Sequence, residues 1–141
     1  ENSLISGGTE VEGTVINSVI GSTVKIGKGA IVKDSVIFSN VEIGDNAVIN
    51  YSIIDENVKI GAEAVIGDEK ADDAKIAVVG RGCTIGKDCV IKNCVISSDV
   101  VIADGTHLEN LIVDKHASVL HIKEIVADPE NPGYVKRGDT L

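Results

Sequence analysis

The chain has 141 residues, a formal net charge of −9 and 43% apolar residues, of which few are aromatic. This acidic balance disfavours nucleic acid and anionic membrane surfaces as partners. No apolar run reaches about 18 residues, so we expect neither a membrane span nor a signal peptide. Three cysteines without the spacing of a disulfide framework favour a reducing compartment, and we expect a cytoplasmic protein.

The chain contains no methionine and starts directly in patterned sequence, so we expect a segment of a longer protein. With one Phe and two Tyr, a core must be filled by small branched aliphatic residues. This composition favours a narrow, regular interior over a broad sandwich core, which usually recruits large rings.

A 17-residue repeat dominates the sequence. Residues 24–40, 41–57 and 58–66 carry the same short sequence pattern, and we call such a pattern a phrase. The pairs that recur at this spacing are Ile26-Gly27, Ile43-Gly44 and Ile60-Gly61. Within one coil the aliphatic anchors are 6, 5 and 6 residues apart, which does not match the 3.6-residue period of a helix. We therefore predict an all-β fold, a parallel β-helix (hexapeptide-repeat solenoid) with three short strands per coil.

About six such coils, stacked about 4.8 Å apart, would form a prism of roughly 30 Å. Residues 7–23 form a looser first coil, and the phrase resumes at Ile85. The spacing from Ile66 to Val79 is eight residues too long, so we predict an external loop at about residues 67–75. We assign residues 1–119 to the β-helix domain and residues 120–141 to a C-terminal strand or tail that caps it.

The three cysteines fall in columns of small residues, and packing explains them better than metal binding or nucleophilic chemistry. We expect Cys83 and Cys89 in the column of Ala30, and Cys94 in the column of Ser35. Glycines such as those around Arg81 look like a phosphate loop, but no strand-then-helix context follows them, so we reject that interpretation.

The histidines are His107, His116 and His121. The spacing of the last two is similar to part of the zinc site of solenoid carbonic anhydrases, but the region that should supply a third ligand has no histidine. Hexapeptide-type acyltransferases use a histidine as general base, and His107 or His116 are candidates for that role. Our interpretation is that the segment has no catalytic, cofactor-binding or metal-binding residues of its own.

Several phrases, in this order, resemble the C-terminal β-helix domain of bacterial glucose-1-phosphate adenylyltransferase (ADP-glucose pyrophosphorylase). The similarity covers roughly residues 1–91. The phrases are residues 2–8, 18–20, 24–27, 34–37, 53–61 and 65–67, followed after the polar insertion by residues 76–80.

The resemblance implies left-handed coiling and an N-terminal nucleotidyltransferase domain that is absent from this segment. That domain makes ADP-glucose and pyrophosphate from ATP and glucose 1-phosphate with Mg²⁺, for glycogen synthesis. The resemblance also implies that the β-helix contacts the catalytic domain and other subunits of a homo- or hetero-tetramer, and forms part of an allosteric site. Plant members carry a lysine for an anionic effector in the phrase matching residues 54–57, where this chain has Glu56, so that site is not carried over.

Two alternatives stay open from the sequence. The first is a free-standing acyltransferase, and the second is the β-helix tail of another sugar nucleotidyltransferase, such as one that makes GDP-mannose.

Overall fold

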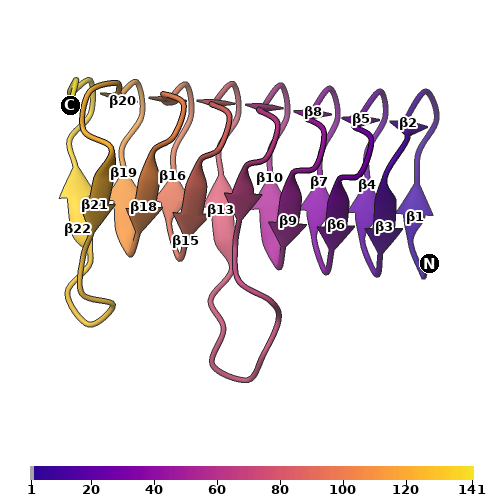
Figure 1. Ribbon diagram of the computed structural model, residues 1–141, viewed down its shortest axis with the longest axis horizontal. Helices are drawn as coiled ribbons and strands as arrows, with labels where there is room; N and C mark the ends of the chain where they lie inside the picture. The colour runs from indigo at the N-terminus through magenta and orange to yellow at the C-terminus, as the bar shows by residue number, and fades with distance from the viewer. Residues whose placement is uncertain (1) are drawn as a thin grey trace.

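The computed structural model describes residues 2–141, and every regular element in this range is a short β-strand. Each strand pairs in parallel with the equivalent strand of the next coil, which produces three sheets of eight, seven and seven strands. Figure 1 shows the strands lined up along one axis, with the N-terminus and the C-terminus at opposite ends. The prediction of an all-β parallel solenoid is confirmed.

We name the three sheets A, B and C in the order in which each coil passes through them. Sheet A consists of β1 (Leu4–Ile5), β4 (Val19–Ile20), β7 (Val36–Ile37), β10 (Ser52–Ile54), β13 (Ala77–Val79), β16 (Val95–Ile96), β19 (Leu111–Val113) and β22 (Gly133–Val135). Sheet B consists of β2 (Glu10–Val11), β5 (Lys25–Ile26), β8 (Glu42–Ile43), β11 (Lys59–Ile60), β14 (Thr84–Ile85), β17 (Val101–Ile102) and β20 (Ser118–Val119). Sheet C consists of β3 (Thr14–Ile16), β6 (Ile31–Lys33), β9 (Val48–Asn50), β12 (Val65–Ile66), β15 (Val90–Lys92), β18 (His107–Glu109) and β21 (Glu124–Val126).

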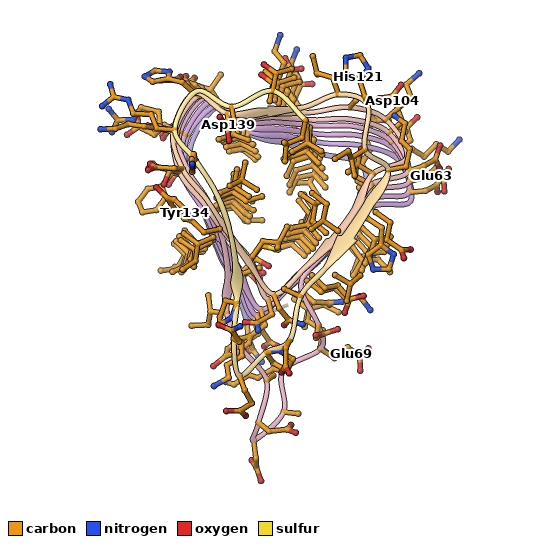
Figure 2. The ribbon with its side chains drawn as sticks, turned by 90° about the vertical axis from the view of Figure 1, so that its left-hand side faces the viewer. Glu63, Glu69, Asp104, His121, Tyr134 and Asp139 are labelled. Atoms are coloured by element: carbon orange, nitrogen blue, oxygen red, sulfur yellow. The ribbon has the colours of Figure 1, made fainter. Side chains whose placement is uncertain are left out.

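The coils wind in a left-handed sense and together form a triangular prism. Seen from the C-terminal end in Figure 2, the chain runs clockwise from sheet A on the left to sheet B at the top and sheet C on the right, while it advances toward the viewer. Most crossover connections between parallel strands are right-handed, so this hand is an exception. Successive coils nearly superimpose in Figure 2, and the three faces are therefore close to flat.

Aliphatic side chains from all three sheets meet along the axis of the prism. Ile26, Ile43 and Ile60 line the inner face of sheet B and are only 2–3% exposed, as the repeat predicts. A ladder of buried serines runs along the corner between sheets C and A, in which the backbone N–H of Ser35 donates to Ser18 Oγ at 3.0 Å and that of Ser52 donates to Ser35 Oγ at 3.1 Å. The ladder satisfies polar groups that burial would otherwise leave without partners.

The glycine after each sheet B anchor is required by space, because the next coil passes directly over it. A Cβ atom at Gly61 would lie 2.6 Å from the backbone nitrogen of Lys87 and 2.7 Å from the carbonyl carbon of Gly86. Positive φ angles at the corners are mostly supplied by other residues, among them Asn40 and Asn57 at 59°. Asn tolerates this left-handed region better than most residues with a side chain.

The predicted external loop interrupts the 17-residue repeat but leaves the pairing of the coils on either side of it intact. Ser52 pairs with Ala77, which is 25 residues further along in place of the usual 17. The loop projects from the corner between sheets C and A (Figure 1), and a second, smaller excursion at residues 128–132 projects from the same corner. Lys92 Nζ and Asp68 Oδ1, 3.3 Å apart, tie the base of the larger loop to the next coil.

The solenoid has about seven turns, one more than the six that the sequence predicts. The difference arises at the C-terminal end, where the repeat is hard to recognise but the strands continue. Residues 120–141 contain β21 and β22, which pair with β18 and β19 and extend sheets C and A. No described residue belongs to a helix long and apolar enough to cross a membrane.

Candidate functional site

The three cysteines are buried in the wall of the prism. Cys89 and Cys94 lie in the predicted columns of Ala64 and Ser52, but Cys83 lies in the column of Val58, not in the alanine column expected for it. Cys83 and Cys89 are too close in sequence to share one column of the repeat, and Cys83 precedes the sheet B strand β14 and not a sheet C strand. A side chain of similar size still fits there.

The environment of these thiols makes them poor nucleophiles. Burial raises the pKa of Cys83 and of Cys94 to about 11, and it also raises the pKa of Cys89. Each Sγ donates a hydrogen bond to a backbone carbonyl, as Cys83 does to Ser97 O at 2.9 Å. The reactive species of a cysteine is the thiolate, so these residues act as packing groups at neutral pH.

His107 is the histidine with the closest carboxylate partner. It lies on the outer face of sheet C, half-buried, with Nε2 2.5 Å from Glu109 Oε2 on the same strand. A histidine that a carboxylate holds through one ring nitrogen is one component of a general-base arrangement, and here Glu109 contacts Nε2 of His107.

The other two histidines lie apart from this pair. His116 is at the corner between sheets A and B, with Nδ1 3.9 Å from Asp99 Oδ2, and His121 follows β20 near the C-terminal end (Figure 2). Within residues 2–141, no three side chains of His, Cys, Asp or Glu are grouped as metal ligands would be.

The corner between sheets A and B forms a shallow polar groove of about 480 Å³, whose lining includes Asp55, Arg81 and Asp114. A hydrogen bond from the hydroxyl of Tyr134 at 2.6 Å, with one from the backbone of Lys115, holds the pKa of Asp114 below its ordinary value. The glycines beside Arg81 form part of this corner and lead into β14, not into a helix.

The outer face of sheet B carries a ladder of mostly charged side chains. In the coil order, Glu10, Lys25, Glu42 and Lys59 lie side by side with alternating sign, as expected of a solvated face. A shallow groove of about 450 Å³ runs along this ladder and the neighbouring glycine column.

The outer face of sheet A is different, because all eight strands place an apolar residue there. We call this row the sheet A stripe; its members are Leu4, Val19, Val36, Ile53, Val78, Val95, Ile112 and Tyr134. Five of them are at least 45% exposed and the other three are half-buried. Figure 2 shows Tyr134 on the outside of this face, in line with a stack of carbon side chains.

The outer face of sheet C has a shorter apolar row. Ile31, Val48, Val65 and Val90 are aligned, but Thr14 lies at one end and His107 and Glu124 lie at the other. Of the three faces described for residues 2–141, sheet A therefore presents the uninterrupted apolar surface.

The sheet A stripe was not predicted from the sequence, although a signal for it exists. The residue before the inward anchor of each sheet A strand is apolar at positions 19, 36, 53, 78, 95 and 112. A half-buried strand would alternate with polar residues at that position. The inward anchors predict the fold, and this outward column is a second pattern that is independent of them.

These features define a class of protein. It is a left-handed β-helix of the hexapeptide-repeat type. Its described surface has flat faces and shallow grooves, which suit contacts with other proteins. Its thiols are buried, and its histidines lie apart from one another. Residues 1–80, more than half of the chain, match the family described as GlmU-like, C-terminal hexapeptide, and the chain belongs to this family.

Among solved structures, the chain is similar to UDP-N-acetylglucosamine O-acyltransferase (LpxA) from Moraxella catarrhalis RH4, with 17% identity and a TM-score of 0.36. The match covers 89% of this chain and 63% of that one. A likeness of this degree says nothing about activity. A comparison with curated protein sequences finds no match.

Proposed function

We propose that this chain is a non-catalytic oligomerisation and regulatory module of a sugar-phosphate nucleotidyltransferase, specifically of a glucose-1-phosphate adenylyltransferase. The observation that carries the proposal is the sheet A stripe, because exposed contiguous apolar surface marks interaction sites. Membership of a family described as a C-terminal hexapeptide domain supports it as well, since such a domain is part of a larger protein.

The buried thiols support a role without chemistry in this segment. Their pKa values are raised, so little nucleophile is available at neutral pH. In this proposal Mg²⁺ and ATP bind to a separate catalytic domain, in the cytoplasm, and that domain and neighbouring subunits are the partners of the solenoid. The order of phrases through residues 1–91, with the polar insertion, favours the adenylyltransferase over other sugar nucleotidyltransferases.

The decisive experiment compares two proteins for pyrophosphate release from ATP and glucose 1-phosphate with Mg²⁺. The full-length gene product should consume both substrates, and the 141-residue chain alone should not. GTP with mannose 1-phosphate serves as the control substrate pair. Turnover by the isolated chain, or a full-length product that accepts only the control pair, would reject the adenylyltransferase assignment.

The second candidate function is that of an acyltransferase, because Nε2 of His107 lies 2.5 Å from Oε2 of Glu109. It predicts that the chain binds acetyl-CoA and that His107→Ala abolishes acyl transfer while leaving the fold intact. Titration calorimetry with acetyl-CoA that shows no heat at millimolar ligand would remove this candidate.

A further inference from the structure

We propose that the sheet A stripe is the contact between two copies of this chain, packed face to face with their long axes parallel about a two-fold axis that runs along the prism. This inference rests on the proposed function, since it specifies the face and the geometry of its oligomerisation. It follows from the shape of the face, the size of the face and the charges along its two edges.

The shape of sheet A suits a copy of itself. Most sheets twist, so two of them meet over a limited length, whereas the coils here superimpose along the axis (Figure 2). A flat row of apolar side chains can meet an identical row along its whole length. An interface that repeats the same patch on both partners is the ordinary geometry of a two-fold dimer.

The size of the face is sufficient for a weak, reversible dimer. Eight strands spaced about 4.8 Å apart make a stripe about 34 Å long. With a face about 15 Å wide, contact would bury about 500 Å² on each copy, or about 1,000 Å² in total. This total is at the lower limit for specific interfaces, so the dimer should dissociate on dilution.

The charges at the edges distinguish the parallel arrangement from the antiparallel one. Along the C-terminal half, the edge next to sheet B carries charges of both signs, with the cations Arg81, Lys115, Lys136 and Arg137 interspersed with the anions Asp99, Asp114 and Asp139. The opposite edge carries the two loops, where the exposed lysines Lys70 and Lys75 are outnumbered by exposed anions at Asp68, Glu69, Asp72, Asp73, Asp128 and Glu130.

A two-fold axis along the prism places each edge of one copy against the other edge of its partner, at the same height. The edge of mixed charge would then lie beside the acidic loops, which keeps the two acidic edges apart. In the antiparallel arrangement the same edges face each other, and the loops at residues 67–76 of both copies meet near the axis. Like charges would then be juxtaposed, which costs binding energy.

The first test is sedimentation equilibrium of the chain and of two matched variants. The wild-type chain should show a monomer–dimer equilibrium. Val95→Lys places two like charges across the axis and should raise the dissociation constant at least about tenfold. Val101→Lys is the control, because Val101 is a similarly exposed valine on the outer face of sheet B (46% and 39% exposed). Circular dichroism checks that both variants fold.

A strictly monomeric chain, a trimer, or equal effects of the two variants would overturn the choice of face and partner. None of these results depends on the enzyme assay of the full-length product. A monomeric chain from an active adenylyltransferase would reject this inference alone, and a dimeric chain from an inactive product would reject the proposed function alone.

The second test fixes the orientation with a short bismaleimide, since packed sheets lie about 10 Å apart. In the parallel dimer, Val19→Cys should cross-link to itself, and so should Ile112→Cys. In the antiparallel dimer neither would, and only a mixture of the two variants would cross-link. The wild-type chain is the control, because its three cysteines are buried. Cross-linking only in the mixture would overturn the parallel arrangement.

Discussion

Gly61 shows how little space separates neighbouring coils. An added methyl group would meet backbone atoms of Gly86 and Lys87 at 2.6–2.7 Å, and those atoms cannot rotate away. We expect Gly61→Ala to lower the free energy of unfolding by about 1–3 kcal/mol through overpacking. Chemical denaturation measures this, with Gly7→Ala as the control, since nothing lies within 4 Å of a Cβ at Gly7. Equal stability of the two variants would show that the coils can separate easily.

The buried thiols predict how stability depends on pH. Burial raises the pKa of Cys94 from 9.0 to about 11, so the unfolded chain loses this proton at lower pH than the folded chain does. The stability that comes from the protonated thiol is thus complete below about pH 9 and is lost as the pH rises toward 11. Cys94→Ser, which restores the residue of its column, should lose less stability than the wild type in this window. Parallel pH profiles of the two proteins would argue against the shift.

The insertion at residues 68–75 leaves the pairing of the flanking elements intact, because β10 and β13 form the same ladder as other sheet A neighbours. We expect deletion of these eight residues to change the free energy of unfolding by less than about 1 kcal/mol, since a loop of this length adds little closure entropy. Thermal unfolding followed by circular dichroism measures the effect. The lost ion pair between Asp68 and Lys92 is exposed and should contribute little. Failure to fold would mean that the loop directs the register.

At the scale of elements, the sequence predicts the strands that follow the 17-residue repeat and misses the features that depart from it. The anchors such as Ile26 and Ile43, the position of the insertion and the three-stranded coil follow from spacing, because each inward column must stay apolar. The seventh turn was missed because the anchors near Ile125 lack the flanking phrase. The contact between His107 and Glu109 depends on side-chain conformation, which spacing alone does not give. The column of Cys83 does follow from spacing, since Cys83 precedes Ile85 as Val58 precedes Ile60, and it was misassigned.

Across the whole molecule, stability should be highest in the middle of the prism and lowest at its ends. A central strand such as β10 has a hydrogen-bonded neighbour on each side, whereas β1 has one, and Leu4 and Ile5 are 72% and 48% exposed. We expect amide hydrogens of the central coils to exchange at least about tenfold more slowly than those of the first coil. Uniform protection from end to end would instead indicate one all-or-none unfolding unit.

The pairing of each coil with its immediate neighbours also has a consequence for biosynthesis. The backbone N–H of Lys25, for example, donates to the carbonyl of Val41 in the next coil. Each described strand pairs only with strands of adjacent coils. Each pairing therefore closes a loop of a single coil, which costs less entropy than pairing with a distant segment would. A polypeptide leaving the ribosome could therefore complete one turn after another as it emerges, with each finished layer serving as the template for the next.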